Sequence, residues 1–292
     1  IERAGVHSGD SIAVYPPQNL SPELIQTIED YTIRVAQGLN TIGLVNIQFV
    51  ISEGVVYIIE VNPRASRTIP FLSKVTGIPM ANLAMQGILG IKLKDQGYRT
   101  GLVPSKSGVY VKMPVFSFNK LKKVDTVLGP EMKSTGEIIG KDVILSKALY
   151  KAFRAANIEI PEYGTALLTI ADKDKHEILP LAKRLVAVGY RLLATKGTGE
   201  ALLEAQVPVT ILQNGEAKRE NILKRMHDGE IQFIINTMTE GKTEETDGYF
   251  IRREAADNNL PCLTSLDTAE ALLQAMEMMH FQLQAVGTEP VF

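Results

Sequence analysis

The sequence contains one cysteine, four histidines and a formal net charge of only −2 in 292 residues. The single thiol, Cys262, excludes an internal disulfide and suits a reducing compartment, so we expect a cytoplasmic protein. The histidines are scattered and have no metal-ligand spacing. The near-balance of charge gives no electrostatic reason to expect a nucleic acid or an anionic membrane as a partner.

Long apolar runs are also absent. No stretch approaches the roughly 20 residues that a helix needs to cross a bilayer, so we expect no membrane span. The N-terminus has no signal-peptide pattern, and the chain begins at Ile1 rather than at Met, which indicates a fragment of a longer chain. Hydrophobic residues make up 45% and charged residues 22%, as in ordinary soluble globular proteins.

The most informative stretch is a predicted β-hairpin near residue 50. Two runs rich in β-branched and aromatic residues, 44–51 and 55–62, flank a Ser-Glu-Gly connection. Side chains alternate along a strand, so Glu60 and Asn62 share a face. A connection of odd length, three or five residues, would bring Gln48 to that same face.

One carboxylate and two amide oxygens on one face would suit Mg²⁺, which takes one or two carboxylates together with water and substrate phosphates. Arg64 follows directly, and a guanidinium beside a metal–phosphate site neutralises charge on a transferring phosphoryl group. The same alternation is equally typical of the solvated face of a sheet. From the residues alone, both interpretations remain open.

The segment IIEVNPRASRT at 58–68, with NIQF upstream at 46–49, resembles the ATP-grasp enzymes and, among them, most closely the large subunit of carbamoyl phosphate synthase. Three further segments carry the resemblance along the chain: AGVHSGDS at 4–11, LGPEMKSTGE at 128–137 and ATKGTGEAL at 194–202. That subunit is far longer than 292 residues, so the resemblance implies its C-terminal portion.

The resemblance implies a site that uses ATP with Mg²⁺ or Mn²⁺ to phosphorylate carbamate to carbamoyl phosphate, for pyrimidine and arginine biosynthesis. Glu60 would bridge metal ions, and Gln48 and Asn62 would complete the coordination. Glu60 and Gln48 would also contact the nucleotide, and Arg64 would stabilise the transferring phosphoryl group. The parent enzyme would pair with a glutamine amidotransferase small subunit and could form a higher oligomer. The chain alone would be inactive, because the first half of the ATP-grasp unit is missing.

The small, polar segment at 4–11 is, by its pattern, an ordinary surface turn. In the resembled family, the residues that match Gly5, Val6, His7 and Ser8 line the nucleotide pocket. In some relatives ornithine binds nearby, where Glu2 and Asp10 would match acidic contacts and Thr264 would roughly match a threonine. Tyr110 stands where a glutamate is expected, so we do not expect activation by ornithine.

The pattern of elements changes near residue 158. Residues 1–157 mix strands and helices irregularly, with a helix that begins at Ser21-Pro22. Beyond 158, apolar strands at 165–171, 190–194, 207–211, 233–236 and 262–264 alternate with helices at 176–188, 199–205, 218–228, 249–258 and 267–280. We therefore predict an α+β domain at 1–157, a partial ATP-grasp unit by resemblance, and a doubly wound α/β domain with a parallel sheet at 158–292.

Two of these predicted strands run into groups that favour an anion. TKGTG at 195–199 precedes a helix, and Asn236-Thr237 follows the apolar residues 233–235 of their strand. Hydroxyls, glycines and a helix N-terminus attract negative charge, although an N-cap with a turn is the ordinary alternative.

By resemblance this half is the methylglyoxal-synthase-like domain that ends the large subunit and binds a nucleotide effector such as UMP or IMP. The matching effector contacts would be Lys175, Thr195, Thr198 and Asn236. Asn214 and Met238 depart from the pattern, which leaves the identity of the effector open.

Three other functions remain as alternatives. The chain could belong to another ATP-grasp carboxylate–amine ligase, although the TKGTG domain argues against it. The second half could act as a free-standing enzyme on a phosphorylated triose, but no catalytic aspartate can be placed. The third alternative is a regulatory module that only binds a phosphorylated ligand.

Overall fold

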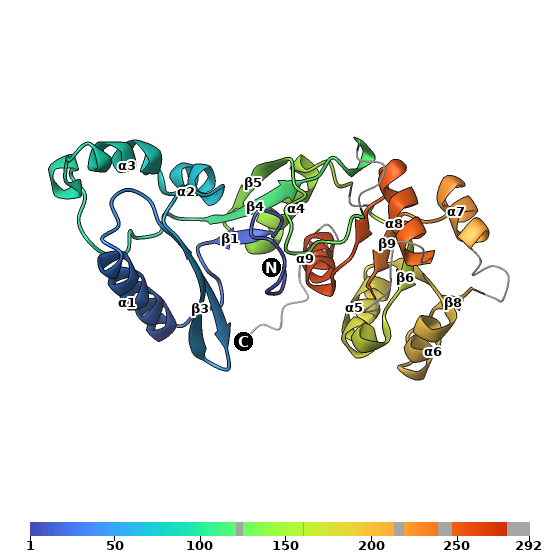
Figure 1. Ribbon diagram of the computed structural model, residues 1–292. Coiled ribbons are helices and arrows are strands. Elements are labelled where there is room, and N and C mark those ends of the chain that lie inside the picture. The colour runs from blue at the N-terminus through green and yellow to red at the C-terminus, as the bar shows by residue number, and fades with distance from the viewer. Residues whose placement is uncertain (121–124, 160, 213–218, 239–246, 279–292) are drawn as a thin grey trace, which may run out of the picture. The chain divides into compact units, whose positions relative to one another are not determined.

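The computed structural model describes residues 1–120, 125–159, 161–212, 219–238 and 247–278 (Figure 1). The chain divides into two compact units. One is formed by Ala13–Lys112, and the other by Ile1–Ile12 together with the chain from Met113 onward. The predicted boundary near residue 158 therefore lies within the second of these units.

The unit formed by 13–112 is built from one long helix, a hairpin and two short helices. Its elements are β1 (Ala13–Tyr15), α1 (Pro22–Gly38), β2 (Asn46–Ser52), β3 (Val55–Asn62), α2 (Thr68–Thr76), α3 (Met80–Ile88), a 3₁₀ turn η1 (Leu93–Gln96) and the first part of β4 (Val109–Val115). As predicted, α1 begins at Ser21-Pro22, where the Ser21 hydroxyl accepts a hydrogen bond from the backbone N–H of Leu24. β1 pairs antiparallel with β4, with Val14 opposite Val111.

The other unit contains β5 (Gly136–Asp142), α4 (Leu145–Ala155) and a five-stranded sheet. The strands of this sheet are β6 (Gly164–Thr169), β7 (Tyr190–Ala194), β8 (Thr210–Ile211), β9 (Phe233–Asn236) and β10 (Cys262–Leu263), in the order β10-β9-β6-β7-β8. All four pairings are parallel. Its helices are α5 (Lys175–Ala187), α6 (Lys196–Glu204), α7 (Arg219–His227), α8 (Asp247–Asp257) and α9 (Leu266–Glu277), with short 3₁₀ turns at Phe118–Lys120 and Asp172–Asp174.

Both faces of the sheet are covered, because the neighbouring residues Leu167 and Leu168 on β6 point to opposite faces and are both fully buried. Leu167 belongs to the cluster that includes Ile222 of α7 and Ile251 of α8. α5 packs against β7 and α9. The prediction of a doubly wound parallel sheet is confirmed.

The chain reverses direction once across this sheet. From β6 it moves to β7 and β8 on one side, and it then returns to place β9 on the other side of β6. The carboxyl ends of β6 and β9 therefore form a topological switch point, where ligands bind in open α/β sheets.

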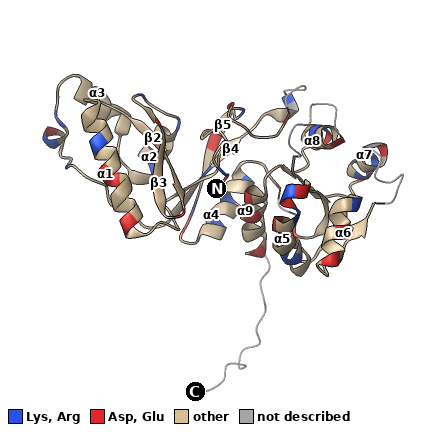
Figure 2. Ribbon diagram, turned by 60° about the horizontal axis from the view of Figure 1, so that its bottom comes forward, with Lys and Arg blue, Asp and Glu red and all other residues tan. Residues whose placement is uncertain are grey.

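Figure 2 shows acidic and basic residues interspersed along the helices, which agrees with the small net charge of −2. Among the described residues, no helix has the length and apolar character required to cross a bilayer.

Candidate functional site

The two strands of the β2–β3 hairpin are joined by a two-residue turn. Glu53 and Gly54 both have positive φ, 51° and 77°, as in the type I′ turn that suits the twist of a hairpin. The predicted connection of odd length is therefore wrong. Pairing starts with Ser52 opposite Val55, and an unbroken ladder from there would place Gln48 opposite Ile59.

A β-bulge changes the register further along the hairpin. Phe49 pairs with Ile58, but Gln48 pairs with Glu60, so Ile59 has no partner in the ladder. One extra residue reverses the alternation of faces along the bulged strand. Glu60 and Asn62 therefore face the same side as Gln48, as predicted, but they reach it through a bulge rather than through an odd turn.

The polar face contains one amide that was not predicted. Asn46 lies directly opposite Asn62, so two cross-strand pairs, Asn46–Asn62 and Gln48–Glu60, stand side by side. Side chains of directly opposed residues start about 5 Å apart. The even spacing of Asn46 and Gln48 on one strand was the signal that sequence reasoning could have used.

The opposite face of the hairpin is apolar. Its residues are Ile47, Phe49 and Ile51 on β2 and Val56, Ile58 and Val61 on β3. The bulge thus keeps apolar side chains on one face although Ile58 and Val61 are separated by an odd number of positions.

The side chains on the polar face are open to a ligand. Glu60 is exposed, and Gln48 and Asn62 are half-buried. Arg64 is also exposed, and its Nη1 donates to the Ala65 carbonyl at 3.0 Å. Within the described ranges, no three or more histidine, cysteine, aspartate or glutamate side chains gather into a metal site. A cation on this face would therefore rely on one carboxylate, the amide oxygens and oxygens brought by a phosphate ligand.

The segment Gly5–Ser8 belongs to the other compact unit. Gly5 has a φ of +109°, and the backbone N–H of His7 donates to the Gly129 carbonyl at 2.8 Å. The His7 Nδ1 accepts from the Gly9 N–H at 3.0 Å. The segment is therefore an ordered turn held by backbone contacts.

Asp10 fastens this turn to the segment around Lys133. The Asp10 side chain is fully buried, and its two oxygens accept from the backbone N–H groups of Lys133 and Ser134 at 2.8 and 2.9 Å. The Ser134 hydroxyl in turn donates to the Gly9 carbonyl at 3.2 Å.

A polar cavity of about 210 Å³ opens at the switch point of the parallel sheet, and we call it the switch-point cavity. Its lining comes from the ends of β6, β7 and β9 and from α8, and comprises Thr169, Ile170, Ala171, Thr195, Asn236, Thr237, Met238, Asp247, Gly248 and Arg252. Two of the four predicted effector contacts, Thr195 and Asn236, are in this lining.

Thr195 and Thr198 have different surroundings. Thr195 is the N-cap residue of α6 and lines the cavity. Thr198 is buried with 2% of its surface exposed, and its hydroxyl accepts from the Ile170 N–H at 3.0 Å. Thr198 therefore joins α6 to the end of β6 and is not among the residues lining the cavity.

Lys175 brings positive charge to the first turn of α6. Its Nζ pairs with Asp172 Oδ1 at 2.7 Å. A Cβ atom on Gly197 would lie 3.0 Å from the same Nζ, so the ammonium rests against the glycine of the TKGTG segment. A side chain at position 197 would require the ammonium to move by a few tenths of an ångström.

Sequence reasoning missed Arg252, which lines the switch-point cavity from α8 with 3% of its surface exposed. Its Nη1 donates to Asn236 Oδ1 at 2.8 Å, and its Nε donates to Asp125 Oδ1 at 2.8 Å. The partner Asp125 is 127 positions away in the sequence, so no local pattern indicated that this arginine is buried. Of the two departures, Met238 lines the cavity and Asn214 lies outside the described residues.

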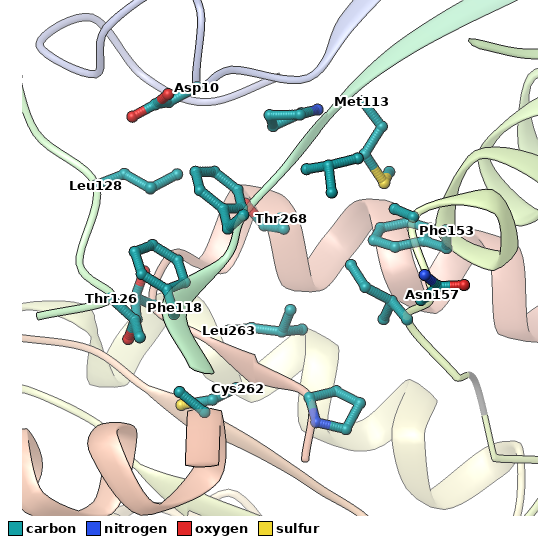
Figure 3. A pocket seen from close by; sticks show the side chains of 18 of the residues that line it. Asp10, Met113, Phe118, Thr126, Leu128, Phe153, Asn157, Cys262, Leu263 and Thr268 are labelled. Carbon is teal, nitrogen blue, oxygen red and sulfur yellow. The ribbon is translucent and has the colours of Figure 1, made fainter. Parts of the chain in front are cut away.

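A second cavity of about 330 Å³ lies in the same unit, and we call it the apolar cavity. Figure 3 shows apolar side chains such as Met113, Phe118 and Leu263 gathered around it. Glu2 and Asp10 also line it, but Glu2 already accepts from the Ile12 N–H at 2.6 Å and the Thr268 hydroxyl at 3.2 Å. Burial raises the pKa of Glu2 above its ordinary value of 4.5.

Two family models match the chain. Residues 2–96 match the carbamoyl-phosphate synthase L chain, ATP binding domain, and residues 177–264 match the MGS-like domain. The chain fits the C-terminal portion of the carbamoyl phosphate synthase large chain. The hairpin lies within the first match, which supports ATP as a ligand and an ATP-dependent ligase family. Thr195, Asn236 and Arg252 lie within the second match.

Proposed function

We propose that this chain supplies the carbamate-phosphorylating site of a glutamine-dependent carbamoyl phosphate synthase, acting in the cytoplasm in pyrimidine and arginine biosynthesis. The observation that carries the proposal is the register of the hairpin. It places the Glu60 carboxylate opposite Gln48, with Asn62 on the same face, inside the part of the chain that matches an ATP-binding domain.

The oxygens of Glu60, Gln48 and Asn62 fit Mg²⁺ or Mn²⁺ because they are hard donors with only one charge among them. Such an ion supplies charge neutralisation at phosphate oxygens when it is bound. Arg64, exposed next to Asn62, would hold the transferring phosphoryl group through charge-assisted hydrogen bonds. Phosphoryl transfer needs positioning and charge stabilisation more than covalent chemistry, and these side chains have the means for both.

The segment Gly5–Ser8, in the other compact unit, is a separate candidate for contacting the nucleotide. It offers backbone groups and the His7 ring in an ordered turn. A glutamine amidotransferase small subunit would supply ammonia to the complete enzyme. Another carboxylate–amine ligase of the ATP-grasp type is the weaker alternative, because the MGS-like match has no place in it.

The test of the synthase proposal uses the longer chain in which these residues occur, assayed for ATP formation from ADP and carbamoyl phosphate. Glu60→Gln should lower this activity at least about 100-fold, because it removes the only carboxylate from the polar face. Glu53→Gln, in the turn of the same hairpin, is the matched control and should retain activity. Equal activity of Glu60→Gln and the control would refute the assignment.

We further propose that the switch-point cavity binds a nucleotide monophosphate such as UMP or IMP. Its support is the position of the cavity at the switch point, together with the α6 N-terminus and the Lys175 ammonium beside it. The phosphate would lie at the first turn of α6 and contact Thr195. The same chain could thus be a regulatory binding module when it is tested alone.

Calorimetric titration of UMP and IMP into this chain tests the effector proposal. Lys175→Ala should weaken binding about 10-fold or more, because a charge-assisted contact to the phosphate is lost. Lys183→Ala changes an exposed lysine on the same helix and should leave binding unchanged. Absence of binding of both nucleotides to folded wild-type chain would refute the proposal.

A further inference from the structure

Arg252 has an unusual position between the two cavities. Among the described residues that line either cavity, it is the only one that lines both. It is almost fully buried, although arginine is rarely buried unless it is paired. The buried guanidinium of Arg252 is therefore expected to be paired with other polar groups.

The first partner is Asp125. Arg252 Nε and Nη2 donate to the two Asp125 oxygens at 2.8 and 2.5 Å, a bidentate pair. Burial is the largest single influence and opposes the charged form of Asp125. The hydrogen bonds and charge of Arg252, together with the Val127 N–H and the charge of Lys133, outweigh burial and hold the pKa of Asp125 below its ordinary value. The pair is therefore ionic.

The second partner is Asn236. Because Arg252 Nη1 donates to Asn236 Oδ1, the Asn236 amide is oriented with its NH₂ group as the remaining polar end. One of its two N–H bonds points to Thr169 Oγ1 at 3.0 Å. No described residue accepts from the second N–H bond, which can therefore donate to a ligand in the switch-point cavity, and a donor is the group that an anion requires.

The Asp125 end of the pair leads to the turn at residues 7–10. Lys133 Nζ donates to the carbonyls of Asp125 and Val127 at 3.0 and 2.6 Å, and the backbone N–H of Lys133 donates to Asp10 at 2.8 Å. The same stretch accepts the His7 N–H through the Gly129 carbonyl. A continuous series of hydrogen bonds thus joins Asn236 to the turn at residues 7–10.

We propose that Arg252 is a positioning residue of the switch-point cavity. It orients Asn236 so that the amide N–H can donate to a phosphate-bearing ligand, and its positive charge interacts with both that ligand and Asp125. The inference rests on the proposed effector function. A bound anion and the Asp125 carboxylate compete for one guanidinium, so ligand binding weakens the hold on residues 125–134. By thermodynamic linkage, weakening that hold must favour the ligand.

Two substitutions distinguish positioning from simple structural support, with UMP and inorganic phosphate as probes in calorimetry on the whole chain. Arg252→Gln should lower the affinity for both probes about 10-fold or more, because it removes the charge and releases Asn236. Asp125→Asn should raise the affinity several-fold, because it removes the competing carboxylate. Both should lower the melting temperature, so binding and stability change in opposite directions only in Asp125→Asn.

Arg191→Lys, at an exposed arginine of β7, is the matched control and should change neither quantity. Arg252→Lys keeps the charge but not the planar fork, and it should bind the probes more weakly than wild type. If Arg252→Gln does not fold, Arg252→Lys and Asp125→Asn together test whether Arg252 positions the ligand. Hydrogen exchange of the amides at 127–134 should become faster in wild type at saturating UMP and should not respond in Asp125→Asn.

The outcomes separate this inference from the effector proposal. If wild type binds neither probe, the effector function fails and the role of Arg252 falls with it. If wild type binds but Asp125→Asn lowers affinity in parallel with stability, Arg252 is only a structural residue and this inference alone is overturned.

Discussion

Gln48 and Glu60 face the same side of the hairpin only because Ile59 has no partner between them. With the two-residue turn alone, Glu60 would face the side opposite to Gln48. The bulge adds one residue to β3 and moves Glu60 to the same side as Gln48. As a result, a continuous apolar run on β3 can end in a carboxylate that faces a polar side. The turn and the bulge are therefore both needed for the proposed metal-binding face.

The turn can be tested through Gly54. Its φ of +77° is unfavourable for any residue with a Cβ, so Gly54→Ala should lower the free energy of unfolding by about 1 kcal/mol. Gly38 ends α1 with open space around its missing Cβ and no positive φ. Gly38→Ala should therefore be neutral or stabilising by about 0.5 kcal/mol. Denaturant unfolding would measure both, and equal effects would contradict the assigned turn.

Asn46 offers a second test of the polar face. Asn46→Ala should weaken metal-dependent nucleotide binding by less than Glu60→Gln does, because an amide carries no charge to a cation. Nucleotide titrations at several Mg²⁺ concentrations would rank the two variants in the longer chain that contains these residues. A larger effect of Asn46→Ala would mean that the cation sits away from Glu60.

The two threonines of the TKGTG segment should separate stability from binding. Thr198→Val leaves the buried N–H of Ile170 without its acceptor, which should lower the free energy of unfolding by about 1–3 kcal/mol. Thr195→Val should leave stability nearly unchanged and weaken UMP binding. Thr198→Ser keeps the hydroxyl and should recover most of the stability.

The buried Glu2 predicts a pH effect on stability. Its pKa is raised in the folded state by burial, so the folded chain binds this proton more tightly than the unfolded chain does. The contribution is fully present below the ordinary value of 4.5 and is lost as the pH rises through the raised value. Relative to Glu2→Gln, wild type should therefore lose stability as the pH increases from about 4.5.

Unfolding of wild type and Glu2→Gln between pH 4 and pH 8 would measure this difference, with Glu204→Gln, at an exposed carboxylate of α6, as the control. A stability difference that stays constant over this range would show that Glu2 does not change its proton affinity on folding.

Local chemistry made part of this structure predictable from the sequence. Ser21-Pro22 determines where α1 starts, and short apolar strands between helices predicted the parallel sheet, because each signal lies within a few neighbouring residues. The length of the hairpin connection was predicted wrongly. The turn has two residues, and the bulge at Ile59 brings Gln48 and Glu60 to one face, but no local pattern marks Ile59 as the unpaired residue.

The switch-point cavity shows the same limit. The positions of Thr195 and Asn236 at strand ends indicated an anion site, and the family resemblance implied both as effector contacts. Arg252 depends on Asp125 and could be recognised only in three dimensions. Thr195 and Thr198 looked equivalent in the sequence, and packing alone made one a lining residue and the other a link between α6 and β6.

The only cysteine of the sequence lines the apolar cavity, and burial raises its pKa to about 12. Because the thiolate is the reactive form, the raised pKa should slow the reaction of this half-buried thiol with alkylating reagents at neutral pH. Cys262 follows Pro261 at the start of β10, on the wall that the apolar cavity shares with Arg252. The rate at which Cys262 is labelled should therefore respond to a ligand or a substitution that changes this wall, and it can be measured without adding a probe to the chain.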